Sequence, residues 1–384
     1  MDCRGLIDGN ARQHPVAAAQ RSYRRDIGTG GCGAVCHGSS SDAGARVLKV
    51  ERPEGDFARG YDRAAKGQSS YFVWLNRGKD SVVLDLVTDE GKLRLADMIA
   101  GADVFIQNLK PGSAAKLGFD PRQLCAGNPR LICCSISGYG ADGPLAERKA
   151  YDLLIQAESG LCSITGGPDE PSRVGISIVD IATGAIAHAA ILEALIGRSI
   201  NGQGADIQVS MFDVMADWLT VPLLNHEAGN TPRRLGLMHP SIAPYGVFTT
   251  ADGSPVLISI QSEREWAALC RGVIDAPEAV SDPATCTNVA RVENRERTVR
   301  LVSAAFGALG REEAVAKLDK NGIAFAVVND MQGLADHGEL KRVVVQTPAG
   351  PVSFPQPAAK FRGAPRSYGA VPGLGETPNE ARDR

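Results

Sequence analysis

Asp180 is the residue best suited to chemistry, because this carboxylate lies between Ile178, Val179 and Ile181. A carboxylate in apolar surroundings is poorly solvated, and beside a helix N-terminus it is a usable covalent nucleophile. Residues 181–198 follow with the composition of a long helix, and Asp is also a favoured N-cap. The residues alone leave two interpretations of Asp180 open, a nucleophile or a helix cap.

The composition is that of a soluble globular protein. The chain has 384 residues, with 43% hydrophobic and 22% charged residues, and this length favours two domains. A net charge of −3 without a dense Lys/Arg run argues against a nucleic-acid or membrane-surface partner. The apolar stretch 181–197 is interrupted by His188 and Glu193, and the N-terminus lacks a signal-peptide core, so we expect a cytoplasmic protein.

Metal binding is not expected. The nine cysteines have no repeating spacing, and Cys32 and Cys36 lack a second pair at zinc-site spacing. We expect the cysteines to be reduced core residues.

The first half of the chain alternates apolar strand-like runs with helical ones. Strands are expected at 47–51, 81–86, 103–108 and 131–137, with a helix at 88–100. This rhythm is typical of a parallel α/β sheet. The large domain is completed by the following elements: helices at 150–162 and 181–198, a strand at 205–211, and a helix to about 228.

A smaller α+β domain is expected after the Pro/Gly/Arg-rich segment 229–243. It would begin with a hairpin that turns at Asp252 and Gly253. Its other predicted elements are helices at 262–274, 291–308 and 311–320 and a strand at 324–329. The expected division is therefore a large domain over 1–228, a small domain over 229–334, and a C-terminal segment over 335–384 that returns to the large domain.

Six blocks along the chain together resemble the class III CoA-transferases, the superfamily of formyl-CoA transferase, carnitine CoA-transferase and α-methylacyl-CoA racemase. The blocks are GARVLKVERPEGDFAR at 44–59, NRGKDSVVLDL at 76–86, ADVFIQNLKPGSAAKLGF at 102–119, NPRLICCSISGYGADGP at 128–144, the segment 149–184, and AGPVSFPQPAAKFRGAP at 349–365. The resemblance implies a large Rossmann-like open sheet domain, a small α+β domain and an interlocked homodimer.

By this resemblance, Asp180 is the aspartate that attacks the acyl-CoA carbonyl. A mixed anhydride, an aspartyl-CoA thioester and a second anhydride would follow in turn. Oxyanion donors could come from glycine-rich turns such as 165–167. Asp152 aligns with an acidic residue of the transferases and either assists thioester turnover or caps the helix that follows it.

The resemblance also implies a CoA site. CoA carries phosphates and an adenine, so its site needs cations and hydrogen-bonding groups on loops. The residues at the family's CoA-contacting positions are Arg52, Asn108, Lys116 and Lys149, with Leu84 and Leu117 as apolar walls for the adenine. For each cation, the alternative is a solvated surface position. A CoA thioester is expected as substrate, and no tightly bound cofactor.

Tyr151 favours transfer over racemisation. The racemases use a His, in a Gly-His-Asp triplet, at the position of Tyr151. A tyrosine with an ordinary pKa of about 10 is a poor proton shuttle at neutral pH. A racemase-like enzyme and a catalytically impaired acyl-CoA-binding pseudoenzyme remain as alternatives.

The acceptor is expected to be a small dicarboxylic acid. Segments 224–227 and 233–241 resemble those of family members that act on itaconate, mesaconate, citramalate and malate, with succinyl-CoA as donor. Arg233, Arg234 and His239 are candidates for binding the second, non-reacting carboxylate. Alternatively, these three residues belong to a surface loop.

Residues 1–41 depart from the family. Relatives have a strand, a turn and a VAAP-type loop before the block at 44–59, whereas 25–41 reads RDIGTGGCGAVCHGSSS, with no apolar strand and no helical period. Codons permitted for these residues, read one base later, encode a loop of the family's form. We hypothesise that residues 1–41 are translated in a shifted frame, which would remove the first strand and one wall of the active site.

Overall fold

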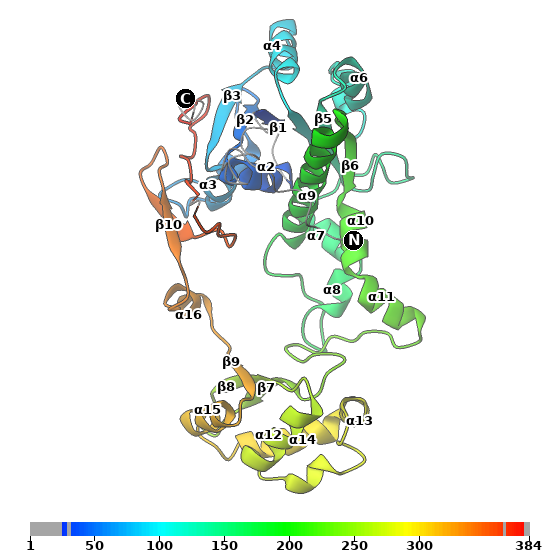
Figure 1. Cartoon of the computed structure of the whole chain (residues 1–384), viewed down its shortest axis with the longest axis vertical. Helices are drawn as coiled ribbons and strands as arrows, with labels where there is room; N and C mark the ends of the chain where they lie inside the picture. The colour runs from blue at the N-terminus through cyan, green and yellow to red at the C-terminus, as the bar shows by residue number, and fades with distance from the viewer. Residues whose placement is uncertain (1–24, 29–31, 364–365, 380–384) are drawn as a thin grey trace, which may run out of the picture. The chain divides into compact units, whose positions relative to one another are not determined.

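The computed structural model describes residues 25–28, 32–363 and 366–379, and these divide into two compact units (Figure 1). The first unit contains the described residues up to Ser159, then Val174–Thr220 and the described residues from Lys341 onward. The second contains Gly160–Arg173 and Val221–Leu340. Compared with the division expected from sequence, the second unit also includes residues 160–173, begins at Val221 instead of 229, and ends at Leu340 instead of 334.

The first unit is built on a six-stranded sheet whose neighbouring strands are all parallel. Its strands are β1 (Arg25–Gly28), β2 (Arg46–Glu51), β3 (Lys79–Val83), β4 (Val104–Gln107), β5 (Ile132–Ser137) and β6 (Asp206–Ser210). The strand order β3-β2-β1-β4-β5-β6 is that of a doubly wound, Rossmann-like domain. Ligands of such domains bind beyond the carboxyl ends of the strands.

Helices surround this sheet. They are α2 (Cys32–Asp42), η1 (Phe57–Gly60), α3 (Ser70–Asn76), α4 (Asp89–Ala100), α5 (Ser113–Lys116), α6 (Pro121–Gly127), α7 (Asp152–Glu158), α9 (Ile178–Asn201) and α10 (Met211–Trp218). The long helix α9 packs along α2 and against β5 and β6 (Figure 1). By length and composition α9 could also cross a membrane, a test that core helices of soluble proteins pass too.

Two differences from the expected helices bear on the site. Elsewhere, the helix expected at 291–308 is divided into α13 (Asn288–Glu293) and α14 (Arg295–Phe306), and the one expected to about 228 into α10 and α11 (Thr220–Glu227). The helix predicted at 150–162 is divided into α7 and α8 (Leu161–Ile164), because Gly160 adopts a left-handed conformation with φ of 88°. Helix α9 begins at Ile178, three residues earlier than predicted. This shift places Asp180 inside the first turn of α9.

The N-terminal segment forms both elements that its sequence did not indicate. β1 lies in the sheet between β2 and β4, and α2 follows it. The expectation of no strand and no helix here is wrong, because a strand pairs through backbone groups that every sequence supplies. Residues 1–24 and 29–31 lie outside the described residues. The reading-frame hypothesis stays a prediction, which the coding DNA across codons 20–45 would test.

The core of the sheet is apolar. All four residues of β4 are buried, as expected for a parallel strand covered on both faces. One cluster joins the sheet to α4 and α6, and its buried members are Leu48, Val50, Leu84, Leu95, Ile99, Ala102, Phe105, Phe119, Leu131 and Cys133.

The second unit has an antiparallel sheet of order β7-β8-β9. Its elements are α8, α11 (Thr220–Glu227, whose first residue belongs to the first unit), β7 (Tyr245–Thr249), β8 (Pro255–Ser259), α12 (Glu263–Gly272), η2 (Pro277–Val280), α13 (Asn288–Glu293), α14 (Arg295–Phe306), α15 (Arg311–Lys320), β9 (Ala324–Val327) and α16 (Met331–Ala335). β7 and β8 form a hairpin in which Gly253 has φ of 78°. Trp266 and Phe306 are fully buried in its separate core.

The C-terminal segment belongs to the first unit. It starts with the hairpin of β10 (Arg342–Val345) and β11 (Val352–Pro355). Farther along, the amide N–H of Asn379 donates to Asp80 Oδ1 at 3.0 Å, and its side-chain Nδ2 donates to the carbonyl of Lys79 at 2.8 Å. These bonds tie the end of the described chain to β3.

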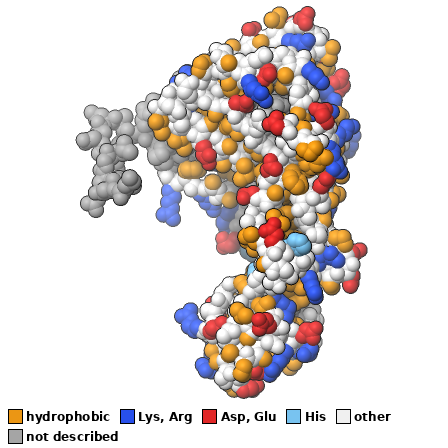
Figure 2. Space-filling model, turned by 90° about the vertical axis from the view of Figure 1, so that its right-hand side faces the viewer, with side chains coloured by type: hydrophobic (Ala, Val, Ile, Leu, Met, Phe, Trp, Pro, Cys, Tyr) orange, Lys and Arg blue, Asp and Glu red, His pale blue; other side chains and the backbone are white. Residues whose placement is uncertain are grey.

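Acidic and basic side chains are interspersed with apolar ones on the face that Figure 2 shows. This mixture agrees with a net charge of −3 spread over the whole chain.

Candidate functional site

Asp180 is the third residue of α9, and the N-cap of that helix is Ser177. The interpretation of Asp180 as the N-cap is therefore wrong. Its side chain is half-buried and belongs to the first helical turn, where the helix dipole favours a negative charge.

Asp152 caps α9 from a different helix. It is the first residue of α7, and its Oδ2 accepts hydrogen bonds from the backbone N–H groups of Val179 at 2.8 Å and Asp180 at 3.1 Å. The first N–H groups of a helix lack partners within the helix, and the Ser177 side chain makes no capping bond. Asp152 therefore supplies the missing acceptor and fixes the backbone of Asp180. The helix that it caps is α9, whereas the sequence suggested the one it begins.

Tyr61 brings a phenol to this site. Burial raises the pKa of Tyr61, and the negative charges of Asp56 and Asp180 and the nearby Tyr151 raise it further. Its ring meets the ring of Tyr71 edge to face, with centroids 5.9 Å apart. Tyr61 therefore stays protonated at neutral pH.

A buried ionic network holds the segment that carries Tyr61. Arg59 donates to both carboxylate oxygens of Glu51, at 2.7 and 2.8 Å, and Lys49 Nζ lies 2.5 Å from Asp56 Oδ2. Asp56 also caps η1, the short helix just before Tyr61.

The pKa values of both carboxyls in this network are lowered. For Glu51, burial opposes the lowering, but hydrogen bonds from Arg59 and Ser81 and the charges of Arg59 and Lys49 outweigh burial. For Asp56, burial is likewise outweighed, chiefly by the charge and hydrogen bond of Lys49. Both carboxylates thus stay ionised at neutral pH and keep the network paired.

The four polar CoA candidates lie on three loops or short helices of the first unit. Lys116 and Lys149 are exposed, and Asn108 is half-buried just after β4. Arg52 is exposed and makes local contacts: its Nε donates to the carbonyl of Gly55 at 2.9 Å, and its guanidinium lies 3.8 Å from the Phe57 ring centroid.

The two predicted adenine walls differ. Leu84 is buried in the core cluster of the sheet, with 3% of its surface exposed, so its side chain offers almost no contact area to a ligand. Leu117 is half-buried and packs against the edge of the same cluster. Of the two leucines, only Leu117 has enough exposed surface to contact a ligand.

An ion pair joins two loops that carry CoA candidates. Lys110 Nζ lies 2.5 Å from Glu147 Oε2. The hydrogen bond and charge of Lys110 lower the pKa of Glu147, and the charge of Lys116 adds to them. An exposed ion pair of this kind adds little to stability.

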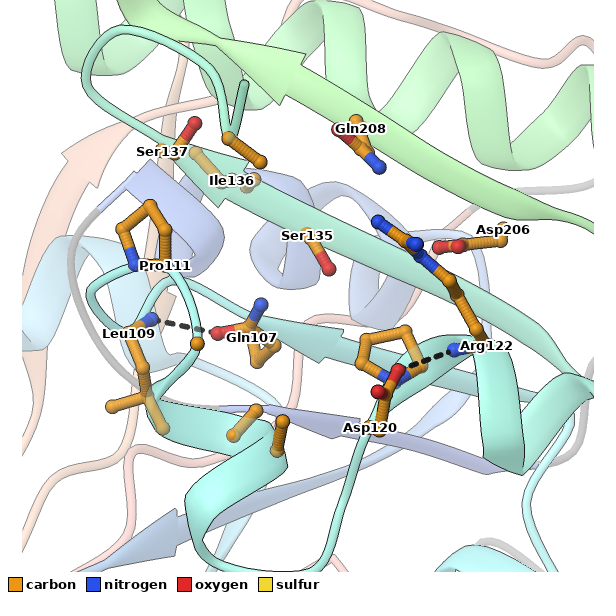
Figure 3. A pocket seen from close by; sticks show the side chains of 15 residues that line it. Gln107, Leu109, Pro111, Asp120, Arg122, Ser135, Ile136, Ser137, Asp206 and Gln208 are labelled. Carbon is orange, nitrogen blue, oxygen red and sulfur yellow. Dashed lines mark hydrogen bonds between the residues drawn. The ribbon is translucent and has the colours of Figure 1, made fainter. Parts of the chain in front are cut away.

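A cavity of about 260 Å³ opens near these loops (Figure 3). Its lining includes Gln107, Ser135 and Gln208, which are adjacent in register on β4, β5 and β6. The Leu109–Ala115 stretch forms another wall. None of the site residues predicted from sequence lines this cavity, although Asn108 and Lys116 flank its lining residues along the chain.

The candidate carboxylate-binding residues belong to the second unit, where Arg234 and His239 contact other residues. The guanidinium of Arg234 donates to the carbonyls of Ser163, Gly167 and Pro168 at 3.0–3.2 Å. His239 stacks on Tyr245, with ring centroids 5.2 Å apart. Arg233 is exposed. Arg234 thus holds the loop with the predicted oxyanion glycines, so Arg233 is the more available cation.

Among the described residues, no group of three or more His, Cys, Asp or Glu side chains could hold a metal ion. The chemistry available to the described site is that of a carboxylate, Asp180, with a phenol at Tyr61 and a carboxylate clamp at Asp152.

Sequence reasoning missed three residues near the site, namely Tyr61, Lys110 and Gln156. Gln156 is fully buried in α7, and its Nε2 donates to Asp152 Oδ1 at 2.6 Å. The spacing of Asp152 and Gln156, four residues apart on a helix, is a sequence signal for that contact. No sequence signal pointed to Tyr61, whose proximity to Asp180 arises from tertiary structure.

Comparison with known proteins identifies the family of the chain. The family model of CoA-transferase family III matches residues 26–377. The chain is 37% identical over 330 residues to an acetyl-CoA:oxalate CoA-transferase of Acetobacter aceti, covering 84% of each chain. It is 33% identical over 333 residues to a succinyl-CoA:glutarate CoA-transferase of Mus musculus, covering 83% of this chain and 75% of the relative.

A solved structure is also similar. The crystal structure of a CAIB/BAIF family protein from Brucella suis superposes with a TM-score of 0.78 at 33% identity, covering 94% of this chain and 97% of that one. With the family match, which spans most of the chain, this likeness establishes the type of enzyme: the protein belongs to CoA-transferase family III.

Proposed function

We propose that this enzyme transfers CoA from an acyl-CoA donor to a small dicarboxylic acid, with Asp180 as covalent nucleophile. The observation that carries the proposal is the placement of Asp180 in the first turn of α9, with its backbone N–H held by Asp152. A fixed backbone orients the carboxylate, and orientation is a large part of what a nucleophilic site supplies.

The proposed reaction has four balanced steps. An Asp180 oxygen attacks the thioester carbonyl, and the C–S bond breaks to give a mixed anhydride and CoA thiolate. The thiolate attacks the Asp180 carbonyl carbon, which releases the donor acid and leaves an aspartyl-CoA thioester. The acceptor carboxylate attacks this thioester, again releases CoA thiolate, and forms a second anhydride. The thiolate then attacks the acceptor's acyl carbon and regenerates Asp180. No oxidant or reductant is needed.

Asp180→Ala tests the proposal. We expect the variant to fold and to lose CoA transfer, because no other carboxylate can form the anhydride at that position. Mass spectrometry of the wild type mixed with donor alone should find CoA attached to the peptide that contains Asp180. Transfer by Asp180→Ala at the wild-type rate would refute the nucleophile.

The substrate pair is proposed from two sources. The resemblance of segments 224–227 and 233–241 favours succinyl-CoA with itaconate, mesaconate or citramalate. The relatives that act on oxalate and glutarate support a dicarboxylate acceptor and extend the range of chain lengths. The assay therefore pairs succinyl-CoA and acetyl-CoA with oxalate, mesaconate, itaconate, citramalate and glutarate. A monocarboxylate used in preference to all five would refute the dicarboxylate class.

Racemisation is the competing activity within the superfamily. Tyr151 is an exposed residue before α7, at the position where the racemases have a His. We therefore expect no deuterium exchange at the α-carbon of a 2-methylacyl-CoA. Exchange at that carbon would favour the racemase, and binding of acyl-CoA without either reaction would favour the pseudoenzyme.

A further inference from the structure

Gln156 uses both ends of its amide inside the first unit. Its Nε2 donates to Asp152 Oδ1 at 2.6 Å and lies 3.5 Å from the carbonyl of Ile176, while its Oε1 accepts from the backbone N–H of Val174 at 2.9 Å. The side chain has no exposed surface. A buried amide satisfied at both ends is held in one orientation, because losing either bond would cost its desolvation.

Asp152 connects Gln156 to the backbone of Asp180 through hydrogen bonds. Asp152 Oδ1 accepts a hydrogen bond from Gln156 Nε2, and Asp152 Oδ2 accepts hydrogen bonds from the backbone N–H groups of Val179 and Asp180. The order of contact is therefore Gln156, then the Asp152 carboxylate, then the first turn of α9. Gln156 also fixes the segment that leads into that turn, through Val174 and Ile176.

We propose that Gln156 is a positioning residue for the nucleophile: it orients the Asp152 carboxylate, which in turn holds Asp180 in its reactive position. This inference rests on the proposed function. An amide suits the role because the position requires a donor toward a carboxylate and an acceptor toward a backbone N–H. No other uncharged side chain of this length offers both groups.

Charge explains why the amide matters. Asp152 is stabilised by two backbone donors at a helix N-terminus, and a neutral donor on its other oxygen leaves that negative charge intact. A second carboxylate at position 156 would repel Asp152 unless it carried a proton. A protonated carboxyl, by contrast, reproduces the amide, because its O–H donates to Asp152 and its carbonyl oxygen accepts from Val174.

This difference yields a pH test with Gln156→Glu. Burial and the neighbouring carboxylate both raise the pKa of the introduced group. Below that pKa the variant keeps the wild-type hydrogen bonds, and above it the bonds are lost. We expect kcat of the variant, relative to the wild type at the same pH, to be unchanged at low pH and to fall about 10- to 100-fold as pH rises. A merely structural glutamine would not give this profile with KM for the acyl-CoA unchanged.

Gln156→Leu is the second variant, and Gln123→Glu on the exposed surface of α6 is the matched control. We expect folded Gln156→Leu to lose kcat at every pH, with KM for the acyl-CoA retained, and Gln123→Glu to follow the wild-type profile. Thermal unfolding of each variant shows whether it is folded. If Gln156→Leu does not fold, the pH limb of Gln156→Glu decides.

Asp180→Asn separates the two proposals. If it abolishes transfer while both Gln156 variants keep the wild-type kcat and pH profile, the positioning role is refuted and the nucleophile stands. If Asp180→Asn transfers CoA at the wild-type rate, the proposed function and the positioning role both fail.

Discussion

Around Asp180, the decisive contacts are made by backbone groups. A carboxylate near a helix N-terminus could itself have been the cap, but Asp152 takes that role from α7 and leaves the Asp180 side chain in the first turn. Asp152 is therefore the capping residue, and Asp180 is left for the nucleophilic role that we propose. Tyr61 adds a phenol whose pKa is raised by burial and by the charges of Asp56 and Asp180.

Tyr61→Phe should weaken catalysis without unfolding the protein. Tyr61 is 64% exposed, so its hydroxyl contributes little to the core. The phenol interacts electrostatically with Asp180, but solvent screens an exposed group, so we expect kcat/KM to fall by only about 2- to 5-fold. The raised pKa keeps the phenol protonated below about pH 10, and the effect should be constant across neutral pH. Steady-state rates measure it, with Tyr71→Phe as control; equal losses in both variants would contradict a specific role.

Among the elements, α2 fits its place least well. It packs against α9, yet it buries Ser40 and Ser41 where an apolar residue would serve better. Ser40 Oγ donates to the carbonyl of Cys36 at 3.2 Å, whereas Ser41 Oγ has no partner among the described residues. The unusual sequence before Gly44 thus places a buried hydroxyl without a hydrogen bond in α2, which lowers the stability of the fold.

Ser41→Ala should stabilise the protein. A buried hydroxyl without a hydrogen bond costs about 1–3 kcal/mol, and Ala also has the higher helix propensity. We expect the free energy of unfolding to rise by about 1 kcal/mol, which is an increase of about 2–4 °C in Tm for a unit of this size. Ser40→Ala, which loses a bonded hydroxyl, should not gain stability. A lower Tm for Ser41→Ala would show that the hydroxyl has a partner in solution.

At the scale of the whole molecule, one face of α9 exposes apolar side chains in the part of the chain that the structure describes. Ile186, Leu192, Ile196 and Ile200 recur at helical spacing, and each exposes between 39% and 82% of its surface. A surface helix normally places such residues against another element. The family resemblance implies a homodimer, and we propose that a second copy covers this face, because it carries the same apolar stripe.

We predict a particle mass of about twice the 40.4 kDa of the chain, measured by light scattering after size exclusion. Ile196→Asp combined with Ile200→Asp should shift the mass toward the monomer, because two charges would be buried without partners. Val87→Asp, on an exposed residue before α4, is the matched control. A wild-type mass of one chain would refute the homodimer, and a dimeric double variant would place its interface elsewhere.

The sequence by itself determined the α/β rhythm, because burial on both faces makes parallel strands read as apolar runs such as 103–108 and 131–137. It also determined the family, through blocks whose order and spacing are preserved. The sequence did not predict β1, because strand pairing uses backbone groups that are the same for every residue type. It also did not predict where α9 begins.

Only the tertiary structure decided which residues surround Asp180. Tyr61, Asp152 and Gln156 are separated from it by 24 to 119 positions, and nothing local in the sequence encodes such proximity. It also showed that Leu84 belongs to the core and that Arg234 binds backbone carbonyls. The residue type fixes which interactions a side chain can make, whereas the packing of distant segments decides which partners it meets. Those partners decide whether a carboxylate caps a helix, as Asp152 does, or stays available for other roles.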